Sequence, residues 1–356
     1  MIEKRDDVWR VRIYWHGKYR CSDTFKLKKD AEAWERKQTL AFAMGTWISP
    51  EAADVTVADY VEKWPLIRPV LKPSAAKREQ STIRTLVLPK FGHRLLSSIS
   101  PSEIKEWANS IVIEHSPSSA RTALGFLGQL YEAAKTDGIV PRNPSESIKL
   151  PRVPYQEPMP LSHEQLWMLA AVMPSRDRLM ALVMGYGGLR SCEAVAVRRS
   201  CLSDGKLRLS VAAVEVSGHF HLGTLKGRAA RSVVLPATVA AELTAWAASL
   251  PDGDPLLFAD RNGNWIRYGN WRTRVLTPAL GEVEVPRITP HNLRDTAASL
   301  AIQAGASVAT VSAMLGHKDP ATTLRHYVGW WPDDLDNVAR LLDEHARSFS
   351  ENHQDN

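Results

Sequence analysis

Residues 289–327 read TPHNLRDTAASLAIQAGASVATVSAMLGHKDPATTLRHY, and the polar residues of this segment decide how the last domain is interpreted. His291 stands where a helix should begin, after a Thr-Pro pair, and Arg294 lies one turn further along the same face. Further on, His317 follows a Leu-Gly pair, and Tyr327 lies on a short helix that an Asp-Pro pair opens. Each group alone is an ordinary helix edge, so only their combination predicts a site.

Two more groups of polar residues precede this segment. Arg190 follows a Gly-Gly turn and stands three residues before Glu193, which by itself predicts only an ion pair at a helix start. Lys226 lies beside glycines between two predicted strands, as many hairpin lysines do. Neither group alone indicates chemistry.

Taken together, the five groups suit the chemistry of a phosphodiester. Its transition state spreads negative charge over the non-bridging oxygens, which the guanidinium groups of Arg190 and Arg294, with histidine donors, can bind. Lys226, on a hairpin, can protonate the leaving 5′ oxygen. The hydroxyl of Tyr327 can attack phosphorus and form an ester. The sequence therefore contains every part of a metal-free phosphoryl transfer.

Around these groups, residues 161–347 have a mixed pattern that predicts a mainly helical domain with a small antiparallel sheet. Helices are expected first and again at the end, up to about Arg347, followed by a frayed tail over 348–356. Between them, three segments have strand character: Leu207–Val211, Val214–Leu222 and Arg231–Leu235.

The preceding part of the chain predicts an all-helical domain and a linker. Six prolines between 141 and 160 exclude a helix or a central strand there, so 151–160 is expected to be an extended linker. Residues 54–150 predict four helices, because capping boxes open two of them, at Thr56 and at Ser100.

The first 50 residues predict a third, small domain of strands and one helix. Apolar and polar side chains alternate from Trp9 to Trp15, the period of a half-buried strand, and a helical pattern follows until Gly45. The stretch has eleven Lys and Arg against seven acidic residues, which fits nucleic-acid binding or a solvated charged face about equally. The candidate DNA contacts are Arg10, Arg12, Tyr14, Lys18 and Arg20.

The length and composition of the chain agree with this interpretation as a multidomain α+β protein. The 356 residues are too many for one compact core, and 44% hydrophobic with 24% charged residues is typical of a globular chain. The net charge of +6 weakly favours a polyanionic partner. Three cysteines without a CxxC pair suit a reducing cytosol, and no apolar run is long enough to span a membrane. We therefore expect a cytoplasmic protein, not a membrane protein.

The order of these five groups along the chain resembles the order in the tyrosine recombinase family, specifically in the phage-type integrases. The resemblance extends beyond the site, because Thr224–Leu225–Lys226 with 231–236 is similar to the family's β-hairpin lysine motif. Residues 139–144 are similar to the end of its SAM-like core-binding domain, and 9–44 to its AP2-like arm-binding module, which has a three-stranded sheet and one helix. The resemblance implies the DNA breaking-rejoining fold for 161–347. It also implies that 1–50 binds arm sites and 54–150 the core site.

The resemblance also implies roles for individual residues. Tyr327 would be the nucleophile that forms a 3′-phosphotyrosyl link, Lys226 the general acid, and Glu193 a support for Arg190. The phosphate would be held by Arg190, Arg294, His291 and His317. Because ester exchange conserves bond energy, no ATP, metal or other cofactor is expected. Asp295 stands where many members carry another histidine, a position without a catalytic role in the family, and the tryptophans at 330 and 331 are expected to be packing anchors.

The implied partners are double-stranded DNA and further copies of the chain. Strand exchange between two duplexes through a Holliday junction needs four protomers, so a homotetramer on DNA is implied. The helix expected over 333–347 has an apolar stripe that would pack on a neighbouring protomer; packing within its own protomer is the alternative. Integration and, with an excisionase, excision of phage or mobile-element DNA are implied, with a host DNA-bending protein as a possible accessory.

Three other functions remain open from the residues alone. A type IB topoisomerase shares the tyrosine chemistry but needs no arm-binding module, and it would relax supercoils without strand exchange. A DNA-binding regulator with a silent site would bind DNA and form no covalent adduct. A metal-dependent nuclease would lose cleavage in the presence of a chelator.

Overall fold

The computed structural model describes residues 1–45, 47–48, 54–152, 159–225, 230–331, 339–340, 342–343 and 346–347. The chain divides into two compact units, Met1–Tyr155 and Gln156–Asn356, and the boundary falls within the segment predicted as a linker. Unit 1 contains two separate hydrophobic cores, one in the N-terminal module and one in a helical part. None of the described helices is both long and apolar enough to cross a membrane.

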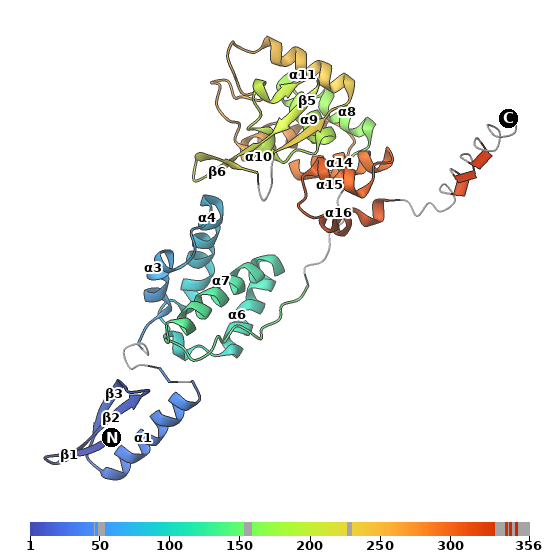
Figure 1. The fold of residues 1–356 in the computed structure, drawn as a ribbon. Helices are drawn as coiled ribbons and strands as arrows, with labels where there is room; N and C mark the ends of the chain where they lie inside the picture. The colour runs from blue at the N-terminus through green and yellow to red at the C-terminus, as the bar shows by residue number, and fades with distance from the viewer. Residues whose placement is uncertain are drawn as a thin grey trace. The chain divides into compact units, whose positions relative to one another are not determined.

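The N-terminal module is a three-stranded antiparallel sheet with one helix against it (Figure 1). The strands are β1 (Ile2–Arg5), β2 (Val8–Trp15) and β3 (Lys18–Phe25), and the helix is α1 (Lys28–Ala43). Val11 and Ile13 of β2 are buried against Ala31 of α1, as the alternating pattern predicts. The sequence patterns did not predict β1, which is short and mostly charged.

The second part of unit 1 is helical, as predicted. Its helices are α3 (Val57–Ile67), α4 (Pro73–Thr82), α5 (Leu88–Phe91), α6 (Pro101–Glu114) and α7 (Pro117–Thr136). A π-helical turn, Ile83–Val87, joins α4 to α5, where Pro89 has no N–H for the ordinary helical hydrogen bond. Both predicted capping boxes form, at Thr56 with Asp59 and at Ser100 with Glu103.

In its described residues, unit 2 contains two small antiparallel sheets. One has the order β4-β5-β8, with β4 (Leu202–Ser203), β5 (Lys206–Leu209) and β8 (Arg231–Val234); the other is the hairpin of β6 (Val211–Val216) and β7 (His219–Thr224). The single strand predicted over 214–222 was therefore wrong. Ser217 and Gly218 have φ of 53° and 83°, the two positive values that a tight hairpin turn requires.

Helices surround these sheets in unit 2 (Figure 1). They are α8 (His163–Ala171), α9 (Ser175–Gly187), α10 (Ser191–Ala194), α11 (Ala237–Ser249), α12 (Tyr268–Trp271), α13 (Thr277–Glu282), α14 (Pro290–Gln303), α15 (Val308–Leu315) and α16 (Pro320–Tyr327). The apolar helix α9 is almost completely buried and packs along α14. This packing brings the end of α9 near the start of α14, where the predicted site residues lie.

Candidate active site

Two helix ends of unit 2 meet at the buried guanidinium of Arg294. The side chain is 2% exposed, and its two terminal nitrogens donate to the carbonyl oxygens of Gly188 and Leu315, each at 2.5 Å. Gly188 ends α9 and Leu315 is the last residue of α15, so both acceptors are helix C-terminal carbonyls. Helix ends carry partial negative charge, which stabilises the buried cation. Burial first, and then the charge of Arg190, lower the pKa of Arg294.

Arg190 begins α10 directly after this turn and is half-buried. One of its terminal nitrogens donates to Glu193 at 2.9 Å, so the ion pair expected from the sequence is present. Glu193 also accepts two hydrogen bonds from Arg231 of β8, at 3.0 and 2.6 Å. Burial alone would raise the pKa of Glu193, but the bonds and charge of Arg231, with those of Arg190, hold this pKa below its usual range. The buried carboxylate therefore stays ionised between two arginines.

His317 lies two residues after the end of α15 and is half-buried. Its Nδ1 is 2.8 Å from the hydroxyl of Thr323 on α16, which fixes the plane of the ring. Gly316, which precedes it, has φ of +68°, and a Cβ built there would come within 3.0 Å of the Arg231 side chain. The turn that carries His317 thus fits closely against a residue that binds Glu193.

Tyr327 is the last residue of α16, and it lies in the interior. It is 4% exposed, and its hydroxyl donates to Oδ1 of Asp295 at 2.7 Å. The ring belongs to a hydrophobic cluster, and the ring of Trp330 lies 4.9 Å from it, centre to centre. Trp331 donates its indole N–H to the carbonyl of Ala306, so both tryptophans are packing anchors, as expected.

His291 stands in the first turn of α14 and reaches the surface. Neighbouring protein atoms limit the hydration of its ring, and this lowers its pKa below the usual value. The carboxylate of Asp295 opposes the shift, whereas Arg294, Arg190 and His326 add to it. The free energy of protonating His291 therefore depends on the positive charge gathered at this site.

The structure brings five of the six predicted catalytic residues into unit 2 around α14. Lys226, the sixth, lies outside the described residues, between β7 and β8. The apolar stripe predicted over 333–347 also falls mostly outside them, and of its apolar side chains only the exposed Leu342 is described.

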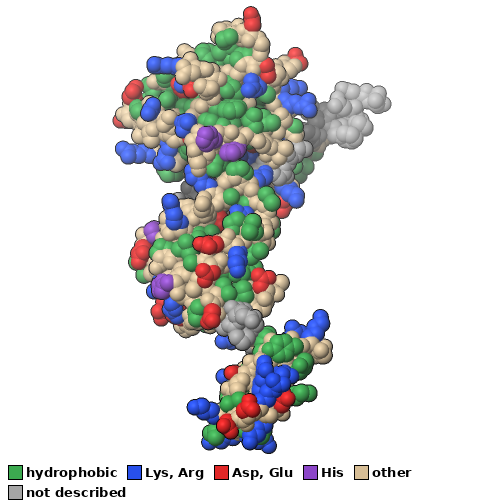
Figure 2. Space-filling model, turned by 90° about the vertical axis from the view of Figure 1, so that its left-hand side faces the viewer, with side chains coloured by type: hydrophobic (Ala, Val, Ile, Leu, Met, Phe, Trp, Pro, Cys, Tyr) green, Lys and Arg blue, Asp and Glu red, His purple; other side chains and the backbone are tan. Residues whose placement is uncertain are grey.

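The five candidate DNA contacts lie in the N-terminal module. Arg10, Arg12 and Tyr14 alternate with the buried residues of β2, so they occupy the sheet face opposite α1. Lys18 and Arg20 are exposed on β3. Figure 2 shows Lys and Arg side chains gathered on the visible face of this module, with acidic residues among them.

Sequence reasoning missed three residues of the site. They are Arg231, which the sequence predicts only as part of a strand motif, Asp295, for which it predicts no catalytic role, and Thr323. The polar residue types were visible in the sequence, but their partners are 38, 32 and 6 positions away. Tyr19 was also missed as a surface aromatic: its ring packs edge-on against Tyr14 at 5.9 Å.

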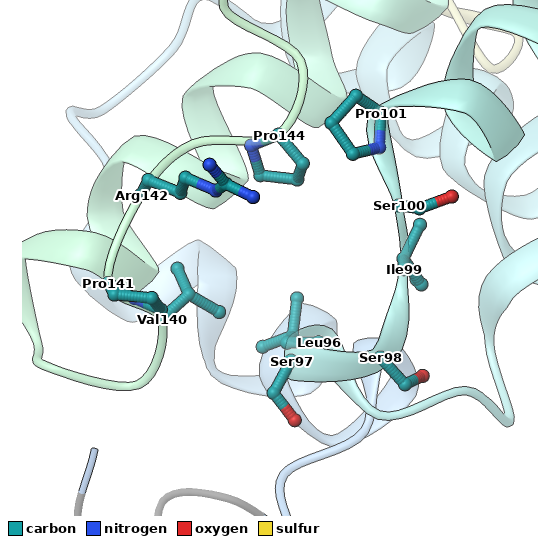
Figure 3. A pocket seen from close by; sticks show the side chains of 10 residues that line it. All are labelled: Leu96, Ser97, Ser98, Ile99, Ser100, Pro101, Val140, Pro141, Arg142 and Pro144. Atoms are coloured by element: carbon teal, nitrogen blue, oxygen red, sulfur yellow. The ribbon is translucent and has the colours of Figure 1, made fainter. Parts of the chain in front are cut away.

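A cavity of about 290 Å³ lies elsewhere, in the helical part of unit 1. Figure 3 shows the segment Leu96–Pro101 facing the segment Val140–Pro144 across it. Its lining includes serines and Arg142 but none of the predicted catalytic residues. The predicted catalytic residues that the structure describes gather instead around α14, in unit 2.

The arrangement suits phosphoryl transfer to a tyrosine. The charges of Arg190 and of Tyr327 both act on Arg294, which directly precedes the acceptor of the Tyr327 hydroxyl, and Glu193 with Arg231 fixes the guanidinium of Arg190. Preorganised donors of this kind stabilise a transition state in which charge builds on phosphate oxygens. A tyrosine ester can then store the energy of the broken bond.

Two family models match the chain. The model described as "Phage integrase family" matches residues 160–330, and the model described as "Phage integrase, N-terminal SAM-like domain" matches residues 56–112. Both matched ranges lie in the parts that the fold assigns to unit 2 and to the helical part of unit 1.

Relatives with curated names agree with these matches. The chain is 25% identical over 325 residues to the integrase of Mycobacterium phage L5, covering 87% of this chain and 86% of the relative. It is 25% identical over 228 residues to the tyrosine recombinase XerC of Chlamydia trachomatis, covering 60% and 67%.

Solved structures show the same fold. The integrase of transposon Tn1549, in complex with a circular intermediate DNA, matches with a TM-score of 0.69 and 18% identity, covering 82% of this chain and 100% of that one. A lambda integrase tetramer bound to a Holliday junction matches with a TM-score of 0.60 and 17% identity, covering 90% and 96%.

Proposed function

The chain belongs to the phage integrase family and is a site-specific tyrosine recombinase, and on that premise we propose that Tyr327 is the nucleophile with which it cuts DNA. The observation that carries this proposal is the position of the Tyr327 hydroxyl beside the first turns of α14, where Arg294 and His291 lie. The residues proposed to hold the scissile phosphate are Arg190, Arg294, His291 and His317.

The reaction conserves bonds at each step. The phenolic oxygen of Tyr327 loses its proton to solvent and forms a bond to phosphorus as the bond to the 5′ oxygen breaks, leaving a 3′-phosphotyrosyl link. Lys226 is the proposed general acid and gives the leaving oxygen its proton. The free 5′ hydroxyl of a partner strand then attacks the link and releases the tyrosine, and a second exchange resolves the Holliday junction. Because each ester replaces another, the reaction needs no ATP and no metal ion.

The test uses a duplex that carries the core of the attachment site with a nick beside the cleavage position. Cleavage releases a short strand that diffuses away, so the covalent adduct accumulates and is seen on a denaturing gel. Tyr327→Phe should bind this duplex with unchanged affinity and form no adduct. Tyr186→Phe, a change at a half-buried tyrosine of the same unit, is the control and should form the adduct normally. An adduct formed by Tyr327→Phe would show that another residue is the nucleophile.

The wider assembly is part of the same proposal. The N-terminal module binds arm-type sites, the helical part of unit 1 and unit 2 bind the core-type site, and linking two DNA sites raises effective concentration. A homotetramer integrates phage or mobile-element DNA in the cytoplasm of a bacterial host, and an excisionase with a host DNA-bending protein permits excision. The lambda integrase tetramer on a Holliday junction supports the assembly by likeness of fold.

A further inference from the structure

The hydroxyl of the proposed nucleophile is held by a carboxylate that no part of the reaction above uses. Asp295 is 6% exposed and accepts the hydroxyl of Tyr327 on one carboxylate oxygen at 2.7 Å. Its other oxygen accepts the side-chain amide of Asn292 at 3.3 Å. Hydrogen bonds from a hydroxyl to an ionised group are among the stronger ones in proteins, so this pair fixes the side chain of Tyr327.

This position withdraws the hydroxyl from an incoming DNA backbone. The ring of Tyr327 is buried with Ile302 and Leu315, and Trp330 lies against it. Attack on phosphorus requires the oxygen to lie about 3–3.5 Å from the phosphorus atom, with its lone pair directed at it. Because Tyr327 is 4% exposed and its hydroxyl is turned to an interior carboxylate, the oxygen must move before it can come within this distance of a phosphorus atom outside.

The charges around Asp295 indicate what displaces it. The carboxylate follows Arg294 directly and lies one helical turn from His291, whose protonated form it favours. A phosphodiester is also an anion, and the same cationic groups suit it. Asp295 hydrogen-bonds the uncharged side chains of Tyr327 and Asn292, so an arriving phosphate would act on it through the electric field of these cations.

We propose that Asp295 is a positioning residue that holds the Tyr327 hydroxyl in a withdrawn state until a phosphodiester enters the cationic site. The description of Tyr327 as the nucleophile rests on the proposed function, but the withdrawn state itself does not. It concerns only the DNA-free protein and can be measured without a recombination substrate.

The test measures how readily the Tyr327 hydroxyl reacts in the full-length, DNA-free protein. N-acetylimidazole acetylates exposed phenol oxygens, and mass spectrometry of a digest gives the rate for each tyrosine. Tyr14 and Tyr19, which are 50% and 56% exposed, serve as internal references in the same sample. In the wild type, Tyr327 should react much more slowly than both.

Removing the acceptor should release the hydroxyl. Asp295→Ala should raise the acetylation rate of Tyr327 by about ten-fold or more, the factor that the loss of one charge-assisted hydrogen bond implies. Asp295→Asn keeps an oxygen that can accept but carries no charge, so its rate should lie between those of the wild type and Asp295→Ala. This graded rescue separates an effect on the hydroxyl from a general loosening of the fold.

A matched control tests the same point in another way. Asp177 is also a buried carboxylate of unit 2 that accepts from an aromatic side chain, the indole of Trp271 at 2.9 Å. Asp177→Asn should leave the acetylation of Tyr327 unchanged, and thermal unfolding of each variant confirms that it is folded. Rapid acetylation of Tyr327 in the wild type would overturn the proposal, as would protection in Asp295→Ala or an equal increase in Asp177→Asn.

The outcome is independent of the adduct experiment. If Tyr327→Phe still forms the covalent adduct while Asp295→Ala releases the hydroxyl, the proposed function fails and the withdrawn state stands. If Tyr327→Phe forms no adduct while the hydroxyl is freely acetylated in the wild type, the function stands and the role of Asp295 fails.

Discussion

The site depends on a single buried carboxylate placed between two arginines. Glu193 is 1% exposed, and it binds both Arg190 and Arg231. A buried anion with two good partners stays charged, whereas removing it leaves two partly buried cations without compensation. Glu193 thus holds the guanidinium of Arg190 in a fixed position. A fixed cation stabilises a transition state better than a mobile one, because it does not have to reorganise during the reaction.

We predict that Glu193→Gln destabilises unit 2 by about 2–4 kcal/mol near neutral pH, because both arginines lose an ionised acceptor. The folded state lowers the pKa of Glu193, so its contribution is full above the ordinary glutamate pKa and is lost as pH falls through the lowered value. The difference between wild type and Glu193→Gln should therefore shrink as the pH falls below about 4.3. Urea unfolding across this pH range measures it.

The control for this prediction is a more exposed ion pair. Glu242 binds Arg178, and the two side chains are 33% and 27% exposed, whereas the Glu193 side chain is 2% exposed. Glu242→Gln should cost less than about 1 kcal/mol, because water screens such pairs. If Glu193→Gln lowers the free energy of unfolding no more than Glu242→Gln does, the role given to Glu193 is contradicted.

At the scale of elements, helix ends assemble the site. The C-termini of α9 and α15 present carbonyls to Arg294, and the N-terminus of α14 presents His291. Gly188 and Gly316 have φ of +65° and +68° and end their helices in the left-handed conformation that glycine adopts at least cost. The chain can therefore turn sharply at both places, and the polar residues that follow lie near each other.

We predict that Gly316→Ala both destabilises the fold and lowers the rate of DNA cleavage. The left-handed conformation costs about 1–2 kcal/mol in an alanine, and the added methyl group would press on Arg231 at 3.0 Å. Gly305→Ala is the matched control, because Gly305 has φ of +83° at the end of α14 with no atom within 4 Å. Urea unfolding should show a similar loss of stability from the backbone conformation in both variants. Only Gly316→Ala should slow adduct formation. Equal cleavage rates in the two variants would show that the contact between residue 316 and Arg231 does not affect catalysis.

For the whole molecule, the proposed function assigns different DNA to different parts. The N-terminal module has its own small core and a sheet face that α1 does not cover. That face carries Arg10 and Arg12 beside the exposed ring of Tyr14. Basic and aromatic side chains on one open face suit phosphate contacts and DNA binding.

We predict that Arg10→Ala, Arg12→Ala and Arg20→Ala each weaken binding to an arm-site duplex and leave core-site binding unchanged. Each should lower the slope of log affinity against log salt by about 1, because one phosphate contact is lost. Arg36→Ala and Lys37→Ala remove the same charge from exposed positions of α1 and are the controls. Fluorescence anisotropy at several salt concentrations measures both quantities. Equal losses in the controls would indicate a general effect of net charge.

We also predict that removing all residues after Pro332 leaves binding of a single core site intact but abolishes tetramer formation on DNA. The reason is the apolar stripe of 333–347, which is proposed to pack on a neighbouring protomer. Analytical ultracentrifugation of the complexes with two core duplexes measures the stoichiometry. An unchanged tetramer would favour packing of this helix within its own protomer.

Local patterns in the sequence were sufficient for much of the fold. The capping boxes at Thr56 and Ser100 both form, and the alternation in β2 places its apolar residues in the core. These signals involve residues at most a few positions apart, so they can be read without knowing the rest of the chain. The hairpin turn at 217–218 was missed, because a Ser-Gly pair can also lie within a strand-like run.

The sequence by itself also determined the family and the residue types of the candidate site, because order and spacing along the chain carry that information. Only the tertiary structure decided which groups touch. It placed Arg231 on Glu193 and Asp295 on Tyr327, contacts between residues 38 and 32 positions apart. Such pairs depend on how α9, α14 and α16 pack against each other, and packing is set by side chains from the whole domain. A charge in the sequence is visible, but its partner is fixed only when the core closes around it.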